Sequence, residues 1–118
     1  MIQPEVRAII AAAAIAHATG RNLSSIYDYS GAGYRSISMQ IAGTKVTGYD
    51  YSISAHFSGS MPSLYHYGVS GHVEFKHKGG NKYGGYDYSS GSHFEVTVKG
   101  NDASFYDYGS SGWTSYSA

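Results

Sequence analysis

The fold is decided by the stretch Tyr86-Asp87-Tyr88-Ser89-Ser90-Gly91-Ser92-His93, whose pattern occurs five times along the chain. Each copy has a Tyr-x-Tyr triplet, then four mostly small residues, then another ring. The middle residues of the triplets are Asp28, Asp50, His66, Asp87 and Asp107. The rings that follow the gaps are Tyr34, His56, His72, His93 and Trp113. A unit repeated at short intervals indicates a repeated supersecondary structure.

The gaps between triplet and ring predict hairpin loops at residues 30–33, 52–55, 68–71, 89–92 and 109–112. Glycine and serine dominate them; both favour turns, glycine weakens strand interiors, and four-residue hairpin loops are common. Further turn signals lie between the units, so the sequence predicts an antiparallel meander of up to ten short strands. Their predicted bounds are 25–29, 34–42, 45–51, 56–60, 63–67, 72–78, 81–88, 93–99, 103–108 and 113–117.

Loop length sets the predicted pairing across each hairpin. Four loop residues place the second tyrosine of each triplet opposite the following ring, a favoured type of cross-strand contact. The predicted pairs are Tyr29 with Tyr34, Tyr51 with His56, Tyr67 with His72, Tyr88 with His93 and Tyr108 with Trp113. The same pairing places Asp28 directly across from Arg35, where the two side chains would form an ion pair.

Alternation along the strands separates two faces of the sheet. We expect the apolar face to form the core, with Ile26, Ile37, Met39, Ile41, Phe57, Leu64, Val73, Phe75, Phe94, Val96, Val98 and Phe105. The middle residue of each triplet points to this face beside its loop, and His77 falls on it near a strand end. The opposite face carries the tyrosines and histidines of the repeats together with Glu74 and Glu95.

The first twenty residues predict a helix over 4–19. Pro4 suits the first helical turn, Glu5 suits the positive helix start, and Gly20 suits the position after the end. Val6, Ile9, Ile10, Ala13, Ala16 and His17 share one stripe, and the back is mostly alanine. His17 is expected to be a hydrogen-bonded core histidine. A signal peptide is the alternative, but Glu5 offsets Arg7 and removes the positive leading segment that such peptides carry.

The width of the sheet limits the architecture. Ten strands at about 4.8 Å spacing span roughly 45 Å, whereas one helix is about 10–12 Å across. We therefore expect a mainly β (α+β) fold in one domain, residues 1–118, with helix 4–19 packed on a curved antiparallel meander of 8–10 strands over 25–117. Closure into a barrel and burial of the apolar face by a second copy are the alternatives.

Composition argues against several classes of partner. Formal net charge is zero and 14% of residues are charged. The chain therefore has no excess of positive charge to attract a phosphate backbone, and we expect no nucleic-acid binding. Low net charge also weakens the repulsion between copies. Cysteine is absent, which excludes disulfides and thiolate metal sites and leaves the compartment unassigned. The helix is too short and too weakly apolar to span a membrane.

The polar residues of the repeat give little support to catalysis or metal binding. Asp28, Asp50, Asp87 and Asp107 suit a cation such as calcium, but a role in accepting hydrogen bonds from loop N–H groups is favoured. His56, His72 and His93 lie about 10 Å apart on neighbouring hairpins, too far to share one zinc ion. No nucleophile elbow or phosphate loop is present, and we expect neither an enzyme nor a cofactor.

The predicted binding surface is the tyrosine- and histidine-rich face. Tyrosine is enriched at interfaces because it presents a large ring and a hydroxyl at low entropic cost. The residues concerned are Tyr49, Tyr51, His56, Tyr65, Tyr67, His72, Tyr86, Tyr88, His93, Tyr106, Tyr108 and Trp113. We expect a non-enzymatic structural protein that self-associates through this face. A carbohydrate- or small-ligand-binding module on the same face, with a polysaccharide partner, is the alternative. The rings also have a purely structural explanation, the stabilisation of a glycine-rich sheet.

Overall fold

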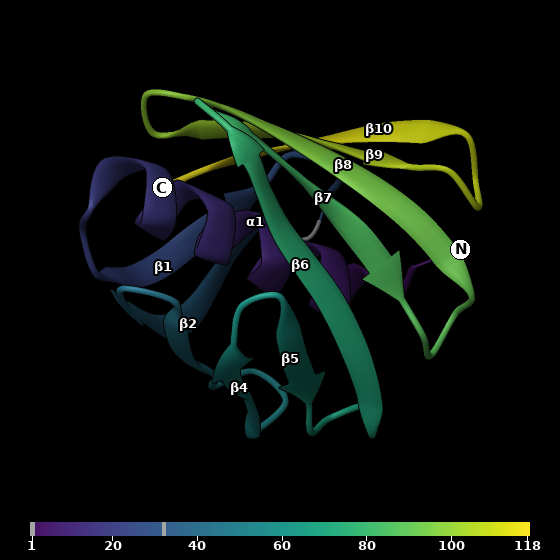
Figure 1. Cartoon of the computed structure of the whole chain (residues 1–118), viewed down its shortest axis with the longest axis horizontal. Coiled ribbons are helices and arrows are strands. Elements are labelled where there is room, and N and C mark those ends of the chain that lie inside the picture. The colour runs from purple at the N-terminus through teal and green to yellow at the C-terminus, as the bar shows by residue number, and fades with distance from the viewer. Residues whose placement is uncertain (1, 32) are drawn as a thin grey trace.

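Ten antiparallel strands follow one another around a closed barrel in the computed structural model, which describes residues 2–31 and 33–118 (Figure 1). Each strand pairs with its neighbours in the chain, and the last strand pairs with the first. The predicted meander is confirmed, and the alternative of full closure is the one found. The bounds are β1 Leu23–Asp28, β2 Gly33–Ala42, β3 Lys45–Asp50, β4 Ala55–Ser60, β5 Ser63–His66, β6 Gly71–Gly79, β7 Lys82–Asp87, β8 Ser92–Lys99, β9 Asp102–Asp107 and β10 Gly112–Ser117.

The helix α1, Pro4–Thr19, lies inside the barrel, and the strands surround it (Figure 1). Every residue from Val6 to Ala16 is buried, so the alanine side of the helix faces strands as fully as the isoleucine side does. The sequence predicted an apolar stripe with an alanine back; in the structure both sides are core. Alanine is required on the back because a bulkier helix would not fit within a barrel of this size.

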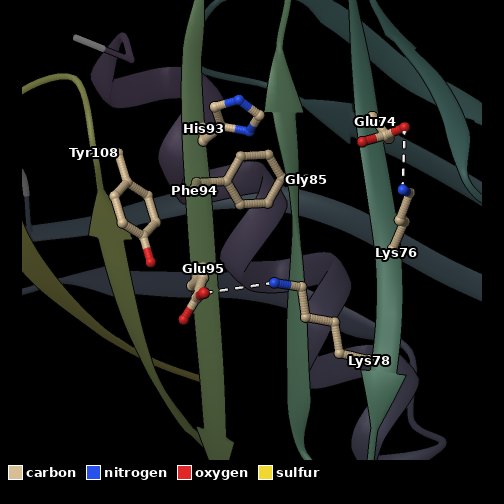
Figure 2. Close-up of a pocket in the computed structure, with 8 residues that line it drawn as sticks. All are labelled: Glu74, Lys76, Lys78, Gly85, His93, Phe94, Glu95 and Tyr108. Carbon is tan, nitrogen blue, oxygen red and sulfur yellow. Dashed lines mark hydrogen bonds and ion pairs between the residues drawn. The ribbon is translucent and has the colours of Figure 1, made fainter.

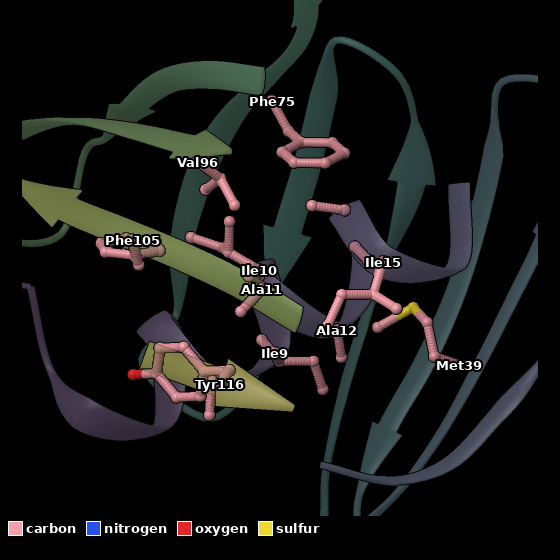
Figure 3. Packing of buried hydrophobic residues seen from close by; sticks show 14 of the residues in the cluster. Ile9, Ile10, Ala11, Ala12, Ile15, Met39, Phe75, Val96, Phe105 and Tyr116 are labelled. Carbon is pink, nitrogen blue, oxygen red and sulfur yellow. The ribbon is translucent and has the colours of Figure 1, made fainter. Parts of the chain in front are cut away.

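The barrel interior is packed by apolar side chains from the helix and from strands all around the wall. Figure 3 shows Ile9, Ile10 and Ile15 of α1 reaching between strand residues such as Phe75 and Phe105. Of the predicted core face, only Ile41 is partly rather than fully buried. His77, near the end of β6, is exposed, but its ring lies 4.8 Å from those of His17 and of buried Tyr83, and its Nε2 lies 2.7 Å from the Gly80 carbonyl oxygen.

Hydrogen bonds at both ends hold the helix in place along the barrel axis. At its start, the Ile2 N–H donates to Asp107 Oδ2 at 2.8 Å, and Arg7 donates to the Ile2 carbonyl at 2.7 Å. At its end, His17 Nδ1 lies 2.7 Å from the Tyr83 hydroxyl, as expected for a hydrogen-bonded histidine. Gly20 ends the helix in the left-handed conformation, with φ of 69°.

The seam that closes the barrel is its shortest pairing. Strands β1 and β10 pair only through Tyr27 with Ser117 and Asp28 with Tyr116, whereas β9 and β10 pair along their full length. One further hydrogen bond crosses the seam, from the Tyr29 N–H to the Ser115 carbonyl at 3.1 Å. The seam joins the last residues of β1, beside the first repeated turn, to the last residues of β10.

Candidate functional site

In each repeated hairpin, the side chain of the middle residue of the triplet holds the turn by a hydrogen bond. The Oδ1 atoms of Asp28, Asp50, Asp87 and Asp107 accept the backbone N–H of the residue two positions on, at 2.8 to 3.3 Å. His66 does the same with Nδ1, which accepts the Gly68 N–H at 3.1 Å. All five side chains are buried. The preference for a structural role over a metal role is therefore supported by direct contacts.

The register of the hairpins differs from the prediction. The first tyrosine of each triplet, not the second, lies opposite the following ring: Tyr27 with Tyr34, Tyr49 with His56, Tyr65 with His72, Tyr86 with His93 and Tyr106 with Trp113. The strands end one residue earlier and resume one residue earlier than predicted. The cause is the side-chain acceptor at the middle position, which starts the turn immediately and moves the second tyrosine into the loop.

The same shift overturns the predicted pair of Asp28 with Arg35. Ile26 lies opposite Arg35 in the structure, and Arg35 reaches the next hairpin instead, where its Nη1 donates to Asp50 Oδ2 at 2.8 Å. Arg35 also donates to the Ser52 hydroxyl at 2.6 Å. This ion pair therefore joins two neighbouring hairpins near the end of the barrel.

The second tyrosine of every triplet also links neighbouring hairpins. Its backbone N–H donates to a carbonyl of the adjacent hairpin, at 2.9 to 3.1 Å. The five bonds run from Tyr29 to Ser115, Tyr51 to Ser36, Tyr67 to His56, Tyr88 to His72 and Tyr108 to His93. Each ring is thus held beside the neighbouring hairpin, so the second tyrosines occupy equivalent places around the barrel.

Three rings pack together on the outside of each hairpin. The first tyrosine lies in the middle and contacts the second tyrosine on one side and the following ring on the other, with centroids 4.6 to 4.8 Å apart. These edge-on contacts are the geometry that aromatic pairs prefer. The first tyrosine is half-buried by its neighbours, and the outer two rings of the cluster remain exposed.

The most exposed of these rings form what we call the aromatic rim. It consists of the described tyrosine and tryptophan rings that are 49 to 79% exposed: Tyr29, Tyr34, Tyr51, Tyr67, Tyr88, Tyr108 and Trp113. All twelve residues of the predicted binding surface lie on the outer wall, half-buried or exposed. Because the sheet is closed, they encircle one end of the barrel and do not form a flat row. Tyr29 and Tyr34 were missed, although the first copy of the repeat carries the same signal.

His66 replaces aspartate in one of the five turns and differs from the others in its charge. It is fully buried, and its Nδ1 accepts a hydrogen bond, which places the proton of the neutral ring on Nε2. Burial lowers the pKa of His66, and the nearby carboxylates of Glu5, Asp50 and Asp87 oppose that shift to a smaller extent. Protonation of Nδ1 would remove the acceptor that holds the turn.

The geometry of the acidic residues offers no metal centre. Among the described residues, no three histidine, aspartate or glutamate side chains are arranged to hold a metal ion. The four aspartates each direct one oxygen at their own turn, and Asp107 also accepts the Ile2 N–H just before the start of α1. They therefore act in building this end of the barrel.

Among several shallow grooves on the outer wall, two lie side by side between neighbouring hairpins and share Glu74. One is about 430 Å³ and is lined by Glu74, Lys76, Lys78, Gly85, His93, Phe94, Glu95 and Tyr108 (Figure 2). The other is about 320 Å³ and is lined by Pro62, Ser63, His72, Val73, Glu74 and Tyr88. The two glutamates share the outer surface as predicted. The lysines beside them were not singled out from the sequence.

Comparisons with family models, with curated proteins and with solved structures find no match to this chain. In the part of the chain that the structure describes, no helix has the length and hydropathy needed to cross a membrane. The class that the fold defines is a closed ten-stranded barrel filled by its own N-terminal helix, with an aromatic rim at one end.

Proposed function

We propose that this protein is a non-enzymatic structural domain that associates with further copies of itself through the aromatic rim. The observation that carries the proposal is the concentration of seven exposed rings, among the described residues, at one end of a small barrel. A soluble monomer seldom leaves so much apolar surface in one region without a partner. The turn bonds use the middle residue of each triplet and the backbone of the second tyrosine, so they do not require the exposed rings.

The area of the rim matches what a stable interface needs. At roughly 200 Å² per ring, the exposed parts of the seven side chains amount to about 800 Å². Standard protein interfaces bury about 800 Å² on each partner. Two rims meeting end to end would therefore form an interface of ordinary size, with tyrosine and tryptophan, the residues typical of interface centres, as its main contacts.

Charge and shape favour a second copy as the partner. The five loops at this end contain no charged residue, and the turn aspartates are directed into the barrel. The formal net charge of the chain is zero, so copies repel one another little. Strand pairing runs around the whole barrel and is short only at the seam between β1 and β10, so association would use mainly side chains.

The test places charge on the rim and keeps the aspartates that hold the turns. In the variant carrying Tyr51→Lys and Tyr88→Lys, two rings on separate hairpins become ammonium groups, which repel the same groups on another copy. Size-exclusion chromatography with light scattering should then show the mass falling from an assembly to a monomer. The wild type should give the larger mass at the same concentration.

The matched control moves the same change elsewhere. Tyr83 and Tyr116 cannot serve as control positions because they are buried. The control therefore carries Thr47→Lys and Thr97→Lys, at exposed outer positions away from the rim. It should assemble like the wild type. Equal loss of assembly in both variants would show that net charge and not the rim governs association, and a monomeric wild type would refute the proposal.

A further inference from the structure

Of the two grooves that share Glu74, the larger is lined on β7 by Gly85, and the neighbouring Gly84 is buried under the Lys78 side chain. Gly84 of β7 lies between Lys76 of β6 and Glu95 of β8, and all three positions face outward. A Cβ atom at Gly84 would come within 2.6 to 2.8 Å of the end of the Lys78 side chain. Lys78 therefore crosses the glycine, and its Nζ lies 3.5 Å from Glu95 Oε1 (Figure 2). The groove spans these three strands.

Charged groups of both signs line this groove. Glu74 pairs with Lys76 at 3.5 Å, and Glu95 pairs with Lys78 at 3.5 Å. All four side chains are at least one-third exposed, so solvent screens these pairs and they contribute little to stability. Their carboxylate oxygens and ammonium groups are available to a ligand as acceptors and donors. The two charges of each sign cancel.

Tyr108 forms one wall of the groove. Its N–H bond to the His93 carbonyl, at 3.1 Å, fixes where the ring leaves the loop. The ring is half exposed, and Figure 2 shows it beside Glu95 on the same surface. Interaction with the neighbouring Glu95 carboxylate raises the pKa of Tyr108. The hydroxyl therefore keeps its proton and remains a donor at neutral pH.

The neighbouring groove repeats the arrangement. His72, Glu74 and Tyr88 take the places of His93, Glu95 and Tyr108, and the Tyr88 N–H donates to the His72 carbonyl at 3.0 Å. Glu74 lines both grooves. Two like sites side by side suit a ligand that is itself a repeat, because binding at one site raises the local concentration at the next.

We propose that the groove lined by Gly85, Glu95 and Tyr108 binds one pyranose ring of a neutral polysaccharide. A pyranose has an apolar face, which Tyr108 stacks against, and a circle of hydroxyls that both donate and accept hydrogen bonds. Glu74 and Glu95 accept from those hydroxyls, and Lys76 and Lys78 donate to them. The volume of about 430 Å³ is within the range of small-ligand sites. The balance of charge disfavours anions and cations alike.

This site shares Tyr108 with the aromatic rim, so its test separates ligand binding from self-association. Maltohexaose, cellohexaose and N-acetylchitohexaose are titrated into the full chain by isothermal titration calorimetry and by NMR chemical-shift changes. We expect saturable millimolar binding of at least one of them, with shifts at Gly84, Gly85 and Glu95. Tyr108→Ala should weaken that binding at least about fivefold, the lower end of the loss measured for stacking rings at nucleic-acid sites.

Two further variants alter the groove and leave the rim intact. Glu95→Ala removes an acceptor, and Gly84→Val displaces Lys78 from its place beside Glu95; both should lose binding and keep the wild-type mass. Tyr34→Ala, which removes a more exposed rim ring outside the groove, should keep binding. Thermal melting confirms that each variant is folded.

Absence of saturable binding to all three oligosaccharides would overturn the proposal. Binding that survives Glu95→Ala and Gly84→Val, or that Tyr34→Ala abolishes as fully as Tyr108→Ala does, would also overturn it, because the rim would then be the site. A wild-type protein that is a monomer and still binds an oligosaccharide would contradict only the function proposed for the rim.

Discussion

Replacement of Asp50 tests how much one turn contributes to the barrel. Asp50 is fully buried. Its Oδ1 accepts the Ser52 N–H at 3.0 Å and the Ser52 hydroxyl at 2.6 Å, and its Oδ2 accepts from Arg35 at 2.8 Å. Asp50→Ala removes all three bonds and leaves the Arg35 guanidinium with the Ser52 hydroxyl alone.

The expected cost follows from these contacts. Hydrogen bonds to a charged group contribute about 1.5–3 kcal/mol each, and removing one partner of a buried ion pair costs about 3–5 kcal/mol. The contributions overlap, and the Arg35 side chain keeps 14% exposure, so we expect a loss of about 3–4 kcal/mol in the free energy of unfolding. A domain has only about 5–15 kcal/mol in total.

Urea unfolding followed by circular dichroism measures this loss. Asp50→Asn keeps an oxygen for Ser52 and loses the ion pair, so it should cost about 1–2 kcal/mol. Asp102→Ala, at an exposed aspartate outside the repeated turns, should stay within about 0.5 kcal/mol of the wild type. A cost below about 1 kcal/mol for Asp50→Ala would refute the argument that the buried carboxylate holds the hairpin and its neighbour together.

Three other changes test the turns and the interior. His66→Asn keeps an acceptor for the Gly68 N–H and removes a titrating group. Burial lowers the pKa of His66 below its ordinary value of 6.5, so the His66 imidazole binds a proton more tightly in the unfolded chain than in the folded one. The stability that this group contributes is therefore complete above pH 6.5 and is lost as the pH falls below it. Unfolding free energies from pH 8 to pH 5 should therefore fall less steeply in the variant; an unchanged slope would contradict a buried neutral imidazole. Gly91→Ala places a side chain at φ of 71° and should cost about 1 kcal/mol in urea unfolding, whereas a neutral result would argue against the left-handed turn. Ala12→Leu overfills the interior and should cost about 1–3 kcal/mol or more in thermal unfolding, whereas Ala18→Leu at the exposed end of α1 should be nearly neutral; equal effects would place the helix outside the barrel.

Much of this fold could be predicted from local patterns. The bounds of the helix follow from Pro4 and Gly20, and the inward-facing residues follow from alternation along the strands. The inward direction of the turn aspartates follows from the same alternation. These features depend on neighbours in the sequence, and the repeat supplies them five times.

The register and the closure needed information that local patterns lack. The hairpin register was wrong because the Asp50 type of turn begins at the middle of the triplet, which moves Tyr51 from the strand into the loop. Closure depends on the summed curvature of ten strands and on an alanine-rich helix that fits inside. Neither the summed curvature nor the fit of the helix can be read from the residues of a single repeat.

The groove was only half predictable from sequence. Glu74 and Glu95 occupy equivalent strand positions, so their shared surface could be anticipated. The position of Lys78 could not, because the pairing of β6 and β7 shifts between His77 and Gly79 and carries that side chain across Gly84. A local irregularity of two strands thus sets which charges meet.

The most direct test of the self-association proposal is the mass of the wild-type protein in solution as a function of concentration. Sedimentation equilibrium over a wide concentration range should give a weight-average mass that rises above the 12.6 kDa of one chain and returns toward it on dilution. The Tyr51→Lys and Tyr88→Lys variant should remain near the monomer mass over the same range. A wild-type mass of one chain at every concentration would contradict the role proposed for the aromatic rim.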